Sequence, residues 1–262
     1  MSAPRRIVPR PIAVPAAVAV VLLALPLVGL LQRAPWSSIL ERLTSGEILE
    51  AIRVSLVVSL SAAALCLVLG LPLAWVLARQ EGPLFSVLRV LVLLPMVLPP
   101  VVGGTALLFA LGRRGLFGEW LDRWFGITLP FTTAGAVVAA TFVALPFFVT
   151  TVESALRDDG TVLDEAAAAA GASPWQTFVH VTLPVLRPSI AAGLALSWAR
   201  ALGEFGATIT FAGSLGGRTR TLPVETFLAL EQDPETAIAV SVLLLAISLA
   251  VLAILRGRWL TR

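Results

Sequence analysis

Residues able to do chemistry are few in this chain. His180 is the single histidine, Cys66 is the single cysteine, and lysine is absent. A phosphate-binding P-loop needs a lysine after its glycines, and a zinc site needs several clustered Cys or His ligands. The sequence therefore predicts no catalytic constellation, no metal site and no nucleotide site in this chain. His180 lies in a polar stretch, where we expect a surface or contact residue.

Two charges stand out because they interrupt an apolar stretch. Arg200 and Glu204 are four residues apart, so on a helix they share one face. A lone charge near the centre of a bilayer costs roughly 2.5–3.5 kcal/mol, so such groups usually pair or face water. We expect an interior ion pair. It is either a clamp between helices or part of a transport pathway, where Arg200 offers positive potential to a passing anion.

A second unusual stretch combines prolines and glycines within an apolar run. Pro99, Pro100, Gly103 and Gly104 lie close together. Proline removes a backbone donor and clashes with the preceding turn, and in lipid the freed carbonyls need neighbouring helices or water. The sequence predicts a kinked helix packed inside a bundle. Two interpretations stay open: a structural kink, or a helix that lines a translocation pathway.

A polar stretch at residues 161–184 has a different character, and its first half predicts a short helix that ends in a tight turn. Thr161, with Asp164 three residues later, resembles a capping box. The alanines that follow have the highest helix propensity. Gly171 then stands where helices commonly end in a left-handed conformation.

The second half of this stretch predicts another short helix. Ser173 is a good N-cap, and Pro174 suits the first helical position because its missing donor costs nothing there. The Leu-Pro pair at 183–184 is expected to end the helix. Trp175 and Phe178 are three residues apart and share one face. Exposed aromatic residues on a short helix indicate a surface for a protein partner.

This stretch resembles the EAA loop of binding-protein-dependent ABC importer permeases, whose pattern is E-A-A-x3-G-x9-I-x-L-P. The matching residues are Glu165, Ala166, Ala167, Gly171, Val181, Leu183 and Pro184, with valine in place of isoleucine. The resemblance implies that the loop faces the cytoplasm, docks into a groove on an ATPase and couples ATP hydrolysis to transport. It extends over roughly residues 50–255.

The elements that position these residues are predicted from composition. Hydrophobic residues make up 58% of the chain and charged residues only 13%, against about 25% in soluble domains. A spanning helix needs roughly 20 apolar residues, and six runs approach or exceed that length. They cover residues 12–31, 54–78, 90–112, 127–152, 188–212 and 236–255. The sequence predicts an all-α integral membrane protein with six transmembrane helices.

Six spans place both termini on one side of the membrane. With the termini inside, 10 arginines fall in inside segments, 8 in outside segments and one in a span, which agrees by a small margin with the positive-inside rule. The first run exceeds the about 7–15 apolar residues of a signal peptide, so it is expected to be a span. We expect one membrane domain with cytoplasmic termini. Residues 1–49 hold the tail, first helix and outer loop, 50–255 the permease core with its coupling loop at about 161–184, and 256–262 a cytoplasmic tail.

Three segments narrow the substrate through resemblance alone. Residues 200–213, RALGEFGATITFAG, are similar to the fifth-helix segment of molybdate/tungstate permeases, and residues 98–104 and 219–226 are similar to the same group. Sulfate permeases share the Arg-x3-Glu theme but are less similar in the Gly-Ala-Thr continuation. The resemblance favours molybdate, with sulfate, thiosulfate or another small oxyanion as the alternative. Tungstate, a dianion of nearly the same size, is not separated from molybdate.

The resemblance implies a type I ABC importer permease fold in the cell's plasma or inner membrane, working by alternating access. The implied partners are a second copy of the chain, a cytoplasmic ABC ATPase dimer that uses ATP, and an extracytoplasmic molybdate-binding protein. The chain is not expected to be an enzyme, to hold a cofactor or to bind nucleic acid, since no basic face lies outside the hydrophobic framework. The rival interpretations are an ion-coupled secondary transporter, in which Arg200 and Glu204 would lie at mid-membrane, a membrane enzyme, and an ABC permease for an unrelated substrate.

Overall fold

The computed structural model describes residues 10–259, apart from the side chains at 10, 158–165 and 254–259. The elements of this described part are all helices, and five of them are long and apolar enough to cross a membrane. They are α1 (Arg10–Gln32), α3 (Gly46–Arg79), α7 (Thr133–Ala169), the continuous helix Pro174–Leu202 that ends in α9 (Leu183–Leu202), and α12 (Pro234–Trp259). The bent pair α4 (Pro83–Val97) and α5 (Pro100–Leu111) is long and apolar enough for a further crossing when the two helices are taken together. The predicted all-α membrane fold is confirmed, and the count reaches the predicted six when the bent pair is taken as one span.

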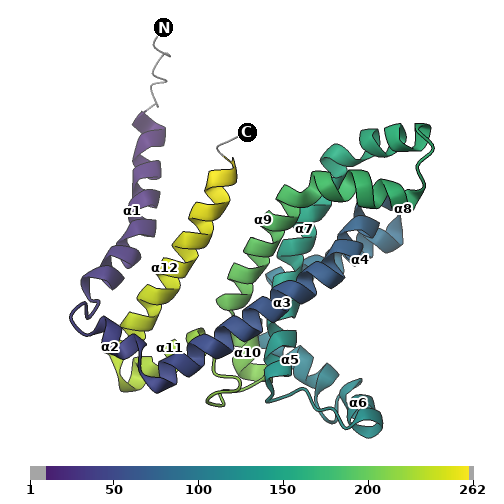
Figure 1. Ribbon diagram of the computed structural model, residues 1–262. Helices are drawn as coiled ribbons and strands as arrows, with labels where there is room; N and C mark the ends of the chain where they lie inside the picture. The colour runs from purple at the N-terminus through teal and green to yellow at the C-terminus, as the bar shows by residue number, and fades with distance from the viewer. Residues whose placement is uncertain (1–9, 260–262) are drawn as a thin grey trace.

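The shorter elements lie toward the two ends of the bundle (Figure 1). Three of them, α2 (Ile39–Leu43), α6 (Gly118–Phe125) and α11 (Leu222–Gln232), lie toward the bottom of the view. The turn between α7 and α8 (Pro174–Thr177) lies toward the top, as do the start of α1 and the end of α12. Both ends of the described chain therefore lie on the same side of the bundle as the α7–α8 turn.

The core forms where α3, α7 and α9 meet, and small residues let these helices approach closely. Phe148 of α7 packs against Gly70 of α3 and Gly193 of α9. A Cβ on Gly70 would lie 2.6 Å from a Phe148 ring carbon, and one on Gly193 would lie 3.2 Å from another. Association between helices in lipid depends on such close packing, because lipid tails are as apolar as the side chains. Other fully buried small residues of this core are Ala62, Cys66, Ala140 and Ala144.

Large apolar side chains cover the outside of the bundle, as expected where lipid is the solvent. α1 is exposed on all sides from Ile12 to Val28 and lies beside α12 (Figure 1). A helix pairs its backbone groups within itself, so it can present an apolar surface to hydrocarbon without unsatisfied polar groups.

The proline-rich run forms a sharp break instead of the predicted kink. α4 ends at Val97, α5 begins at Pro100, and the two helices are bent by 119°. Leu98 and Pro99 are extended, with ψ of 134° and 132°. Each precedes a proline, which disfavours the α region. α5 buries Gly103 and Gly104, whereas α4 buries no residue, so two separate helices stand where the sequence predicts one kinked helix.

Candidate functional site

The turn between α7 and α8 is built as the sequence predicts. Gly171 has a φ of 81°, a left-handed conformation that glycine adopts without steric cost. Its N–H donates to the carbonyl of Ala168 (2.9 Å), and the N–H of Ala172 donates to that of Ala167 (3.0 Å). This is the Schellman pattern that closes a helix end. The prediction that a helix ends at Gly171 is confirmed.

The helix before this turn differs from the prediction. α7 runs from Thr133 to Ala169, so the fourth span and the first helix of the loop are one helix. Thr161 lies inside this helix and begins no new one, because extending an existing helix needs no nucleus and the alanines favour extension. The side chain of Glu165 lies outside the described residues. Ala166 is exposed and Ala167 is buried.

α8 begins with the predicted capping residues. The hydroxyl of Ser173 accepts a hydrogen bond from the N–H of Gln176 (3.3 Å). The side-chain oxygen of Gln176 accepts one from the N–H of Ser173 (2.8 Å). This reciprocal capping box, with Pro174 in the first turn, fixes the direction in which the chain leaves the Gly171 turn.

The expected stop at 183–184 does not form. α8 continues through a π-helix, η1 (Phe178–Thr182), directly into α9. In η1 the N–H of Leu183 donates to the carbonyl of Phe178, five residues back. Pro184 falls in the first turn after this widened segment, where its missing donor is tolerated. Val181, Leu183 and Pro184 are partly buried. Residues 166–184 are called the coupling segment from here on.

Phe178 does not share the exposed face that its spacing from Trp175 predicts. Trp175 is 71% exposed. Phe178 instead meets the edge of Trp75 on α3, with ring centroids 4.6 Å apart, and its centroid lies 5.6 Å from that of Trp175. The guanidinium of Arg79 stacks 3.4 Å from the centroid of the Trp75 ring. Trp175 is thus left exposed on the coupling segment, whereas Phe178 joins the segment to α3.

The predicted ion pair forms at a break in the fifth span. α9 ends at Leu202, and α10 (Gly206–Phe211) begins a few residues later, so Glu204 lies beyond α9 rather than on its face. Arg200 Nη2 lies 2.7 Å from Glu204 Oε2, an ion pair without the alignment of a hydrogen bond. Glu204 Oε1 accepts a hydrogen bond from the N–H of Ala207 (2.8 Å). Glu204 therefore supports the start of α10 as well as pairing with Arg200.

α10 packs against α5 through glycines. A Cβ on Gly104 would lie 2.8 Å from the carbonyl oxygen of Ala207, and a Cβ on Gly206 would lie 2.7 Å from Cβ of Pro100. The structure thus brings together two predicted stretches, the proline–glycine run and the segment after Arg200. It keeps both away from the coupling segment, since α5 and α10 lie below α8 in Figure 1.

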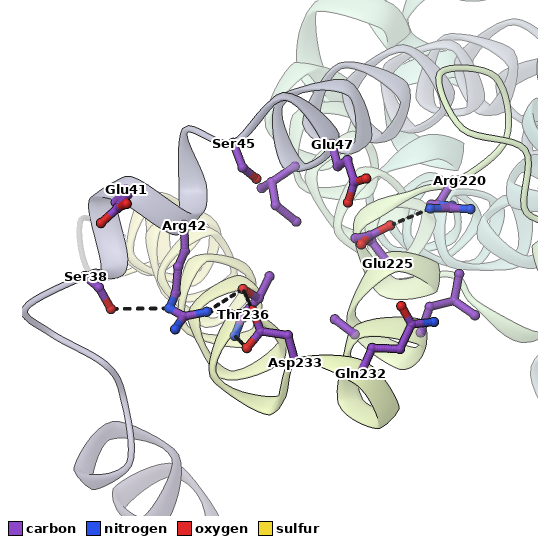
Figure 2. Close-up of a pocket in the computed structure, with 13 residues that line it drawn as sticks. Ser38, Glu41, Arg42, Ser45, Glu47, Arg220, Glu225, Gln232, Asp233 and Thr236 are labelled. Carbon is purple, nitrogen blue, oxygen red and sulfur yellow. Dashed lines mark hydrogen bonds and ion pairs between the residues drawn. The ribbon is translucent and has the colours of Figure 1, made fainter.

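A cavity of about 730 Å³ lies between α2, α3, α11 and α12, at the end of the bundle opposite the coupling segment (Figure 2). Arg42 contacts Asp233 (2.7 Å) and Glu235, and Arg220 contacts Glu225 (3.4 Å). The charged residues that line the cavity are Glu41, Glu47, Glu225, Asp233, Arg42 and Arg220. Four carboxylates against two arginines give the lining a net negative formal charge.

Asp233 directly precedes α12, and its carboxylate accepts three hydrogen bonds. The hydroxyl of Thr236 donates to Asp233 Oδ2 (2.7 Å), its N–H donates to Oδ1 (3.2 Å), and Arg42 lies on the same carboxylate. These donors, the Thr236 hydroxyl first, hold the pKa of Asp233 below its ordinary value. Sequence reasoning missed this cluster, because Arg42 and Asp233 are 191 positions apart.

Comparison with known proteins decides the family. Residues 67–261 match the family described as the binding-protein-dependent transport system inner membrane component. The chain belongs to this family. The permease is 45% identical over 240 residues to the molybdenum transport system permease protein ModB of Mycobacterium bovis, a match that covers 92% of this chain and 90% of that protein.

Other relatives are similar over most of their length. The molybdenum transport system permease protein ModB of Escherichia coli is 40% identical over 213 residues, which cover 81% of this permease and 93% of that protein. The sulfate transport system permease protein CysT of E. coli is 37% identical over 235 residues, which cover 88% and 84%.

Solved structures show the same fold. A bacterial ABC transporter for the import of alginate matches with a TM-score of 0.69 at 20% identity, over 94% of both chains. The MetNI methionine ABC transporter matches with a TM-score of 0.60 at 20% identity, over 80% of this permease and 95% of that chain. The predicted type I importer permease fold is confirmed.

Family membership makes this permease a multi-pass inner-membrane component of a binding-protein-dependent transport system. It is a transport subunit and not an enzyme, as its relatives are named. The predicted location and the dependence on ABC partners in general are confirmed.

Proposed function

We propose that this permease is the membrane-spanning subunit of an ATP-driven importer that carries molybdate into the cell by alternating access. The observation that carries the proposal is the 45% identity to a molybdenum transport system permease over 92% of the chain. In this proposal the coupling segment at one end of the bundle contacts the ATPase. The broken spans near the other end open and close the transport pathway.

The complete transporter would hold two copies of this chain, two ATPase subunits and a molybdate-binding protein. One chain with one coupling segment supplies half of a symmetrical pathway. We place the end with the coupling segment and both termini in the cytoplasm, in line with the arginine distribution. ATP is then used by the ATPase subunits, and this chain holds no cofactor of its own.

The movement would start at the exposed ring of Trp175 and pass through η1 into α9. At the far end of α9 the ion pair of Arg200 and Glu204 holds the start of α10, which lies on α5. Packed helices can move past one another by a small shear, and the close backbone contact at Gly104 is where α5 and α10 would slide. Such sliding at both copies would open the pathway to one side and close it to the other.

Sulfate is the second candidate, because the sulfate permease of E. coli is 37% identical over 88% of this chain. The two oxyanions have the same charge and similar shape, so only a direct comparison separates them.

The test is uptake of labelled molybdate into proteoliposomes that contain the permease, its ATPase and the loaded binding protein. Uptake is expected to require ATP and to be reduced by an equal amount of tungstate, whereas a hundredfold excess of sulfate leaves it nearly unchanged. Sulfate uptake of equal rate, or competition by equal sulfate, would assign the transporter to sulfate. Uptake that persists without the ATPase would indicate an ion-coupled transporter.

A further inference from the structure

Glu153 of α7 is a mostly buried carboxylate that joins three helices near the coupling segment. Its side chain is 13% exposed. Its Oε1 accepts hydrogen bonds from Nε of Arg89 on α4 (3.0 Å) and from Nη2 and Nε of Arg157 on α7 (3.0 and 3.2 Å). A buried charge is retained only where it is paired, and here two guanidinium groups share one carboxylate oxygen.

The same two arginines also close the end of α3. Nη2 of Arg89 donates to the carbonyls of Leu77 and Gln80, the latter at 2.9 Å, and Nη2 of Arg157 donates to that of Leu77 (3.3 Å). Carbonyls in the last turn of a helix lack partners within it, and cations there interact favourably with the helix dipole. Glu153 thus holds both arginines at the C-terminal turn of α3.

That turn of α3 is also the one that meets the coupling segment. Trp75 contacts Phe178 with ring centroids 4.6 Å apart, and Phe178 in turn contacts Trp175 at 5.6 Å. An unbroken series of contacts therefore runs from the exposed Trp175 ring through the last turn of α3 to Glu153. From there it reaches α4, which leads directly to the 119° bend and α5.

We propose that Glu153 is a positioning residue for energy coupling, which ties the last turn of α3 to α4 and α7. The inference rests on the proposed function, since it concerns how movement of the coupling segment reaches α5. With the tie in place, a push on Phe178 moves α3, α4 and α7 together. Without it, the coupling segment moves against a loose helix end, and ATP hydrolysis proceeds without the matching movement of α5.

The test is the Glu153→Gln variant in the complete complex with ATPase and binding protein, reconstituted into proteoliposomes. Both uptake and ATP hydrolysis are measured, and the quantity of interest is substrate taken up per ATP. We expect this ratio to fall about tenfold, a typical size for energetic coupling between sites, while ATP hydrolysis persists. Glu119→Gln is the matched control, since it breaks an ion pair with Arg123 of the same i,i+4 spacing on exposed α6, and its ratio should stay at the wild-type value.

Two further variants keep the test decisive if Glu153→Gln does not assemble. Glu153→Asp shortens the reach of the carboxylate, and Arg157→Gln keeps the Glu153–Arg89 pair and removes one donor, so both should lower the ratio to an intermediate value. An unchanged ratio in Glu153→Gln, an equal fall of uptake and hydrolysis, or failure of all three variants to assemble would overturn the proposal in favour of a merely structural role. Should the wild-type complex carry sulfate instead of molybdate, the ratio is measured with sulfate, so the two proposals fail separately.

Discussion

Replacing Arg200 by glutamine should damage this permease more than replacing its partner Glu204. The Glu204 side chain is 1% exposed and that of Arg200 is 28% exposed. Arg200→Gln leaves a carboxylate buried without its countercharge, which costs roughly 3–5 kcal/mol. Glu204→Gln leaves an arginine that is less buried than the carboxylate, and the new amide oxygen still accepts from the N–H of Ala207, so the loss is smaller, about 1 kcal/mol.

The assay is thermal unfolding of the purified variants in detergent. One kcal/mol shifts the melting temperature of a chain of this size by roughly 2–4 °C, so Arg200→Gln should lower it by about 10 °C and Glu204→Gln by about 3 °C. The double variant should return to within a few degrees of wild type, because no lone charge remains. Uptake by the double variant then separates the two interpretations of the pair: it recovers if the pair is a clamp and stays lost if Arg200 serves the pathway.

The control is Glu119→Gln on α6, where both partners of the ion pair are exposed and the loss should be within about 1 kcal/mol. Equal losses in the two single variants would refute the argument from unequal burial. An Arg200→Gln variant as stable as wild type would refute the ion pair itself as a stabilising contact.

Three other changes test other parts of the molecule. Gly104→Ala should lower the free energy of unfolding by about 1–3 kcal/mol and slow uptake, since its Cβ would lie 2.8 Å from the carbonyl oxygen of Ala207. Gly29→Ala is the control, because a Cβ there would have no atom within 4 Å. Equal melting temperatures of the two variants would contradict the clash. Gly171→Val should strain the left-handed turn by at least about 1–2 kcal/mol and reduce co-purification of the ATPase, while wild-type recovery would count against the turn as its docking element. Asp233→Asn should lower the melting temperature at neutral pH. Because the pKa of Asp233 is lowered on folding, that difference should persist down to about pH 3.8 and vanish only as the pH falls further; a difference lost already at pH 5 would contradict the sign of the shift.

The sequence alone determined the features that depend on hydrogen bonds between residues close in the chain, or on the length of an apolar run. The left-handed Gly171, the Ser173–Gln176 capping box and the six apolar runs depend on residues within a few positions or on simple length. A glycine at a helix end and a serine before a proline act the same way in any surroundings. The same reasoning failed where a residue that favours the start or end of a helix lies next to a helix that has already formed. Thr161 and Pro184 both lie inside helices that continue, because lengthening a formed helix costs less than ending it.

Only the tertiary structure decided which distant residues meet. Neither the pairing of Arg89 with Glu153, 64 positions away, nor the turning of Phe178 toward Trp75 has a signal in local spacing. Arg200 and Glu204 were identified from their spacing, but their unequal burial arises only because the chain breaks after α9 and folds α10 onto α5. The pattern of apolar residues predicts that each helix buries an apolar face. The fit of particular glycines against particular backbones, as between Gly104 and Ala207, determines which faces those are.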